Sequence, residues 1–197
     1  MALLAALFAT VLLMALGVSV LLLGSAEITL ASHDRDARAL TYASRAAAEV
    51  AAVDLAALPS WSGIGSPGVV PEVSATPGTF VDSTLVPSAP WGGAPLDLRV
   101  LTTRLQTESA VASSSAVPVS AWRLFEYGAL SRLIPEASSS NPYYLVVWVA
   151  VWDDVVVARA VAYGPGEARS ITELTNLREV GSGPPERMRR LTVRPGI

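Results

Sequence analysis

The sequence predicts an α+β protein in which a long N-terminal helix, transmembrane in its first half, packs against a small antiparallel sheet. Three observations support this class. Residues 2–23 form an apolar run without a charged residue, residues 27–58 contain neither Gly nor Pro, and residues 143–163 hold two β-rich runs. All fourteen prolines lie at Pro59 or later, so the composition changes where the helix should end.

The apolar run predicts the transmembrane half of the helix, over residues 1–26. About 20 apolar residues at a rise of ~1.5 Å each cover the ~30 Å hydrocarbon core of a bilayer. The alternative is a cleaved secretory signal, because the small residues Gly24–Ala26 resemble a cleavage site. The run is longer than a usual signal core and no Arg or Lys stands before it, so we expect a retained span.

Residues 27–58 predict a soluble, amphipathic continuation of the same helix, because they are rich in strong helix formers and Pro59 follows. Charged residues just after the apolar run should mark the membrane boundary: Glu27, Asp34, Arg35 and Asp36. Small and apolar residues recur at spacings of three and four, which places them on one face that should pack against the sheet: Leu40, Ala43, Ala47, Val50 and Ala57.

Residues 59–95 predict a loop region rich in Pro, Gly and Ser, which carries Trp61 and Trp91. One short strand candidate lies within it, at residues 79–86. The next segment, residues 96–106, mixes β-branched and apolar residues with charged ones and predicts a half-exposed strand.

Residues 96–183 predict an antiparallel β domain. Residues 143–152 and 155–163 are the clearest strands, and Asp153 and Asp154 between them indicate a tight hairpin turn. The "GPGE" sequence at residues 164–167 predicts the next turn, followed by a returning strand over residues 168–180. Residues 120–128 suggest a further strand, with a helix nearly as compatible for residues 128–134. Residues 184–197 form a basic tail or a last strand.

The composition excludes several kinds of chemistry. The chain has no cysteine, its net charge of −3 gives no case for nucleic acid, and it has no phosphate-binding loop or paired zinc-ligand motif. His33 adjoins Asp34 and Ser32, but neighbours on a helix point about 100° apart and form no catalytic triad. We therefore expect no enzyme, no cofactor, no metal and no small-molecule substrate.

Two charged clusters leave alternatives open. Asp153 and Asp154 would suit a calcium site, although adjacent acids in a hairpin are more often turn residues. The basic tail would suit an acidic surface, although a solvated last strand explains it better; its arginines are Arg187, Arg189, Arg190 and Arg194.

Three stretches resemble the PilX-like minor pilins of type IV pilus systems. They are "ASHDRDARALTYASRAAAEVAAVDL", which follows the apolar helix, "NPYYLVVWVA", and "VARAVAYGPGEARSITE". Together with the apolar helix they cover about half the chain. The resemblance implies a helix held in the bacterial inner membrane before assembly and then packed among the helices of an extracellular pilus. Many pilins have a glutamate at the fifth mature position, where this sequence has Ala5.

The resemblance also implies partners, namely other pilin subunits and the pilus assembly machinery. Small residues would let neighbouring helices approach closely within the apolar run, where Leu13 is central. The positions are Ala5, Ala6, Ala9, Ala15, Gly17 and Ser19. Two function hypotheses follow. The first is a minor pilin that primes assembly or modulates adhesion, and the second is a membrane-anchored periplasmic binding module with the loop of Trp61 and Trp91 as its contact surface.

Overall fold

The computed structural model describes residues 2–112, 121–134, 141–152, 155–178 and 188–196. The chain divides into two compact units, Met1–Ala39 and Leu40–Ile197. Helix α1, Ala2–Ala57, continues through this division. The expected boundary at residue 26 follows hydropathy, whereas the observed one falls where α1 begins to bury side chains, at Leu40.

The second unit contains a five-stranded sheet in which every strand pairs with its neighbour in sequence. The order is β1-β2-β3-β4-β5 and all four pairings are antiparallel. The α+β arrangement of a long N-terminal helix and an antiparallel sheet is thus confirmed. The strands are β1 (Arg123–Ala129), β2 (Tyr144–Trp152), β3 (Val155–Tyr163), β4 (Arg169–Arg178) and β5 (Met188–Gly196).

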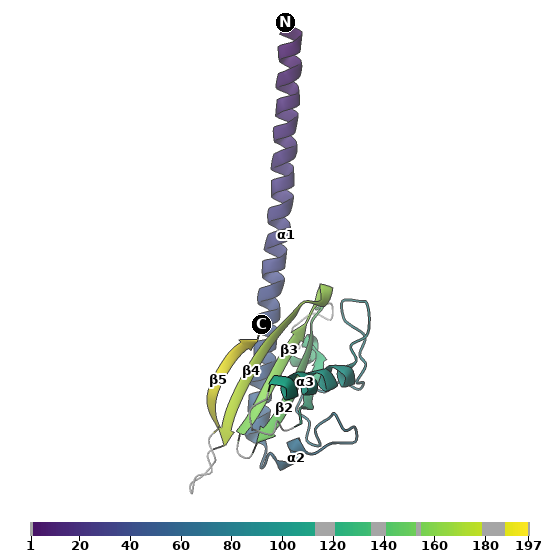
Figure 1. Cartoon of the computed structure of the whole chain (residues 1–197), viewed down its shortest axis with the longest axis vertical. Coiled ribbons are helices and arrows are strands. Elements are labelled where there is room, and N and C mark those ends of the chain that lie inside the picture. Colours follow the sequence, from purple (N-terminus) through teal and green to yellow (C-terminus); the bar gives the residue numbers. More distant parts are fainter. Residues whose placement is uncertain (1, 113–120, 135–140, 153–154, 179–187, 197) are drawn as a thin grey trace. The chain divides into compact units, whose positions relative to one another are not determined.

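Helices cover the two faces of this sheet. The end of α1 lies behind the sheet and α3, Leu98–Ala112, crosses its front in Figure 1. On the α3 side, the Trp148 indole Nε1 donates a hydrogen bond to Thr102 Oγ1 over 2.8 Å. On the α1 side, Ser44 Oγ and Thr172 Oγ1 are hydrogen-bonded over 2.9 Å. Strand β2 is therefore covered on both faces, which explains its apolar sequence.

Small side chains dominate the face between α1 and the sheet. Ala158, Ala160 and Ala162 alternate along β3 on the side opposite Arg159 and Val161, and all three are fully buried. The buried positions of α1 are also mostly small: Leu40, Ala43, Ser44, Ala47, Ala48, Ala51, Ala52 and Leu55. Small side chains on both sides leave little room for added volume, so this packing is sensitive to larger residues.

The predicted strand at residues 96–106 is wrong, because this segment begins helix α3. Asp97 caps the helix: its Oδ1 accepts hydrogen bonds from the backbone N–H groups of Arg99 at 3.0 Å and Val100 at 3.2 Å. Leu98 and Leu105 are buried and Leu101 is half-buried, a helical spacing of apolar residues. β-branched residues in the segment outweighed this cap signal in the prediction.

The loop region is ordered by backbone hydrogen bonds to the edge of β1. Ser74 N–H donates to Leu124 O at 2.9 Å, and Tyr127 N–H donates to Phe80 O at 2.9 Å. Instead of the expected strand at residues 79–86, Val81 makes a single parallel bridge with Tyr127. Covering the outer edge of β1 in this way blocks its pairing with another chain.

The other expectations concern residues 120–134, the turn after β3 and the C-terminal tail. Residues 121–134 contain both predicted elements, strand β1 and the short helix α4, Leu130–Leu133. A 3-10 turn, Pro165–Glu167, follows β3, and a one-turn helix, α2 (Ser62–Gly65), follows α1. The tail forms the last strand, β5, whereas Asp153, Asp154 and Arg187 lie outside the described residues.

The small buried side chains of α1 predict a position-dependent cost of added volume. Ala47→Leu should destabilise the second unit by about 1–3 kcal/mol, because a larger side chain separates α1 from the sheet. Ala56→Leu, on the exposed side of the same helix, should change stability by less than about 0.5 kcal/mol. Chemical unfolding of the full chain in detergent micelles, followed by tryptophan fluorescence, measures both. Equal effects of the two variants would contradict the close contact.

Candidate functional site

The apolar segment of α1 exposes its side chains on every side. All described side chains from Ala2 to Leu23 are exposed, among them six of the predicted positions: Ala6, Ala9, Leu13, Ala15, Gly17 and Ser19. The side chain of Ala5 lies outside what the structure describes. This is the one described helix apolar and long enough to cross a membrane, a test that a signal sequence also passes. A helix that is apolar all round needs cover from lipid or from other helices.

The hydroxyl groups in this segment are satisfied by the helix itself. Thr10 Oγ1 donates to Leu7 O at 2.8 Å, Ser19 Oγ to Ala15 O at 2.8 Å, and Ser25 Oγ to Leu22 O at 2.8 Å. Each bond returns to a carbonyl three or four residues earlier. The segment therefore presents no unpaired hydroxyl from these three residues to an apolar surrounding.

The residues expected at the membrane boundary remain exposed. Glu27, Arg35 and Asp36 lie on the surface of α1, and Asp34 pairs with Arg38 one turn later over 2.8 Å. An exposed pair of this kind adds little stability. These side chains are compatible with a headgroup layer or with water.

The structure corrects the residues expected to pack on the sheet. Leu40, Ala43 and Ala47 are buried, Val50 is half-buried, and Ala57 is exposed. The assignment of Ala57 was wrong because the helix face rotates with each turn and the buried stripe passes through Leu55 instead. Five further positions of α1 are buried that the spacing did not predict: Ser44, Ala48, Ala51, Ala52 and Leu55. With Ala43 and Ala47, the first four of them form adjacent pairs four residues apart.

A buried carboxyl pair connects α1, the loop region and β1. Glu126 is fully buried, and the Thr79 N–H lies between its Oε1, at 3.0 Å, and Asp54 Oδ2, at 2.7 Å. Thr79 also donates its hydroxyl to Asp54. Three segments distant in sequence thus meet at one backbone amide.

The two carboxyl groups share a proton unequally. Burial, and then the hydrogen bond to Asp54, raise the pKa of Glu126 to about 9. Burial also raises the pKa of Asp54, but hydrogen bonds from Glu126 and Thr79 lower it by more, so its pKa lies below the usual value. Glu126 is therefore the neutral donor at pH 7 and Asp54 the charged acceptor.

Gly78 is required beside this pair. A Cβ at Gly78 would lie 2.2 Å from Glu126 Oε1 and 2.4 Å from its Cγ, well inside van der Waals contact. The Gly78 N–H meanwhile donates to Phe125 O at 2.9 Å, which fixes the loop against β1. Patterns along the chain do not indicate this pair, because Asp54, Gly78 and Glu126 come together only in the fold.

The two loop tryptophans have different places. Trp61 is buried, with 6% of its surface exposed, and its indole donates to Leu55 O at 3.0 Å. It therefore caps the end of α1 and cannot serve as the expected contact surface. Trp91 is half-buried and lines a hollow beside α3.

No family model, curated protein or solved structure matches the chain. What its sites can do therefore follows from their own chemistry. Among the described residues, no group of three or more His, Cys, Asp and Glu is placed to hold a metal ion. Complete burial keeps Glu126 from meeting a substrate, so its pair with Asp54 acts as a structural link.

The carboxyl pair predicts a pH-dependent stability. The folded chain keeps the Glu126 proton to about pH 9, whereas the unfolded chain releases it near 4.5, so this group's contribution falls as the pH rises between these values. Glu126→Gln keeps a neutral donor and should flatten that decline, which makes the variant more stable than wild type at pH 9. Thermal unfolding of the full-length wild type and variant at pH 5, 7 and 9 measures this difference in stability.

Glu27→Gln, at an exposed glutamate, is the matched control and should keep the wild-type decline. A Glu126→Gln protein with an unchanged slope would show that Glu126 does not retain its proton in the fold.

Proposed function

We propose that this protein is a structural subunit of a type IV pilus or a related filament, a minor pilin that packs by its N-terminal helix. The observation that carries the proposal is the apolar segment of α1, whose exposed side chains surround the helix over more than 20 residues. An apolar surface of this size is covered either by lipid or by like helices. A pilin uses both in turn, the inner membrane before assembly and neighbouring subunits afterwards.

The rest of the chain supports the proposal by its arrangement. A long N-terminal helix whose later part packs on an antiparallel sheet is consistent with a pilin-like fold. The segments that resemble minor pilins include the buried part of α1, strand β2 and the turn after β3. Partners in this proposal are other pilin subunits and the assembly machinery, and the location is the inner membrane and the extracellular pilus.

A second candidate is a single-pass, membrane-anchored periplasmic binding module that acts outside any filament. It is favoured by one observation, a hollow of about 810 Å³ beside α3 lined by Trp91 and by arginine side chains. Ligand-binding pockets typically have volumes of about 300–1,000 Å³. Mechanical shearing of cells separates the two candidates, because a filament subunit is released with the sheared fibres and a solitary anchored module stays with the membranes.

A charge within the apolar segment should abolish membrane retention. Leu13→Arg places a cation near the middle of the segment, at a cost of at least about 2.5 kcal/mol. Cell fractionation should find less of this variant in the membrane, and sheared filaments should lack it. Leu13→Phe, which stays apolar, is the control. Normal incorporation of Leu13→Arg into filaments would overturn the proposed role of the segment.

A larger residue at Gly17 distinguishes filament packing from simple anchoring. A side chain there meets nothing within 4 Å in the chain itself, so Gly17→Leu should fold and remain in the membrane. Packing between helices depends on small residues, and we expect this variant to be depleted from sheared filaments. Wild-type amounts of Gly17→Leu in filaments would mean that Gly17 lies outside the helix contacts, and would contradict its assignment.

A further inference from the structure

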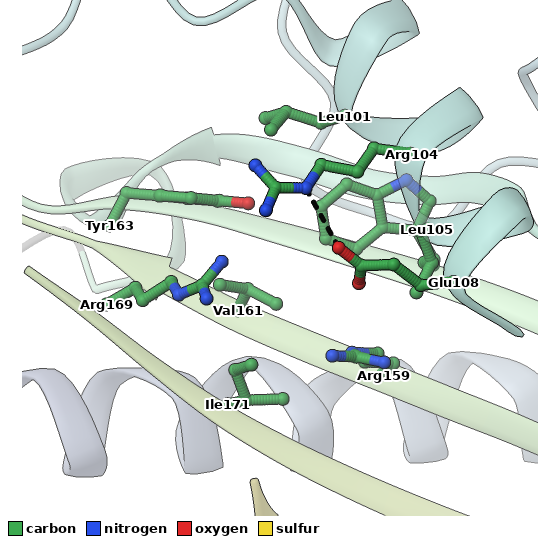
Figure 2. Close-up of a pocket in the computed structure, with 10 residues that line it drawn as sticks. Leu101, Arg104, Leu105, Glu108, Arg159, Val161, Tyr163, Arg169 and Ile171 are labelled. Carbon is green, nitrogen blue, oxygen red and sulfur yellow. Dashed lines mark hydrogen bonds and ion pairs between the residues drawn. The ribbon is translucent and has the colours of Figure 1, made fainter. Parts of the chain in front are cut away.

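Helix α3 and strands β3 and β4 enclose two adjoining hollows, which share four wall residues. These are Leu101, Arg104, Tyr163 and Arg169, and together with Trp91 they define what we call the arginine cleft. Figure 2 shows the Arg104 and Arg169 guanidinium groups and the Tyr163 hydroxyl turned toward the same space. The outer hollow, of about 810 Å³, continues along residues 91–96.

The register of the sheet places these groups together. Tyr163 and Arg169 are directly opposite each other on β3 and β4, and Arg159 and Glu173 are opposite each other four residues further along each strand. Both pairs point to the α3 face, because residues two apart on a strand share a face. Arg104 reaches the same space from α3, so three separate elements supply the cleft.

The arginines differ in how far they are neutralised. Arg104 Nε binds Glu108 Oε1 over 2.8 Å, and Arg159 Nη1 lies 3.4 Å from Glu173 Oε1. Within the described part of the chain, Arg169 has no ion pair or hydrogen bond from its side chain. Arg104 uses only its Nε in the ion pair with Glu108. Within the same described residues, its two terminal guanidinium nitrogens have no ion pair or hydrogen bond.

Tyr163 adds a third hydrogen-bond donor. Burial raises its pKa to about 12, against the opposing effect of Arg169, Arg159 and Arg104, so the hydroxyl keeps its proton at neutral pH. In the described residues this hydroxyl has no hydrogen-bond partner. Guanidinium groups only donate, and a phenol beside them is left to donate as well, so the natural complement is an oxyanion that accepts from all three.

The remaining wall suits the body of a small organic molecule. Trp91 is half-buried, and Leu101 and Leu96 continue the apolar surface beside it. Each hollow also carries one acid: the exposed Glu167 lines the outer hollow, and Glu108, whose carboxylate is paired with Arg104, lines the inner one. The donors of Arg169 and Tyr163, unpaired among the described residues, therefore set the anion-binding part at the wall that the two hollows share. Pockets for small molecules combine a mainly apolar lining with a few converging polar groups in this way.

We propose that the arginine cleft binds a small organic acid, whose carboxylate or phosphate head accepts hydrogen bonds from Arg104, Arg169 and Tyr163 while its body packs against Trp91. This ligand site goes beyond the filament role, since it lies entirely within residues 91–169 and involves no residue of α1. It also holds whether or not the protein enters a filament.

The test is a calorimetric titration of the full chain in detergent micelles with glucuronate, glucose 6-phosphate and neutral glucose. We expect saturable binding of at least one of the two acids, and which one binds identifies the preferred head group. Binding should weaken at least tenfold in Arg169→Gln and should weaken with added salt. Tyr163→Phe, which keeps the ring and loses the donor, should also bind more weakly.

Arg99→Gln is the matched control, because Arg99 is exposed on the same helix α3 and does not line the cleft. It should bind as wild type does, and unfolding curves check that every variant is folded. The proposal is overturned if neither acid binds at up to about 10 mM, ten times a weak Kd of about 1 mM. It is equally overturned if glucose binds as well as the acids, or if Arg169→Gln binds as tightly as wild type.

Discussion

The fold depends on the packing of the second part of α1 against one face of the sheet, where small buried side chains line both sides. Ala43, Ala47 and Ala51 on the helix, and Ala158 and Ala160 on the strand, are all buried. Each of these side chains buries little apolar area, so stability here depends on how well many small groups pack together. The hydrogen bond between Ser44 and Thr172 of β4 fixes the position of the helix along the sheet.

The other contacts of the second unit depend on this placement. With α1 fixed, Asp54 comes to the position where it meets Thr79 and Glu126, and the end of the helix receives the Trp61 indole. The loop region then follows the edge of β1 through its backbone. On the opposite face the sheet is free to accept α3, which leaves the arginine cleft between them. The face of the sheet toward α1 therefore serves packing, whereas the face toward α3 also carries the polar side chains of the arginine cleft.

Much of this arrangement was predictable from local patterns. The end of α1 before Pro59, the two long strands within residues 143–163 and the turn near Pro165 all follow from composition and spacing over a few residues. Helix α3 was missed, because its propensity is weak and its best signal, Asp97 as a cap, is a single residue.

The polar sites could not be predicted, for a physical reason. Glu126 occupies a strand position that alternation alone leaves ambiguous, and its partner lies more than 70 residues earlier in the sequence. Arg104, Tyr163 and Arg169 are likewise ordinary residues until the register of β3 and β4 and the crossing of α3 bring them together. Sequence patterns report on which residues are buried, but not on which distant polar groups meet.

The hydroxyls of Thr10, Ser19 and Ser25 make the apolar segment compatible with more than one apolar environment. Since each is bonded to a carbonyl of its own helix, none of these bonds has to be exchanged when the neighbours of the helix change. Passage from a fluid hydrocarbon to a solid protein interior would alter only dispersion contacts, which are similar in strength on both sides. The hydroxyls of these three residues therefore add no polar cost of their own when one apolar environment of the helix is exchanged for another.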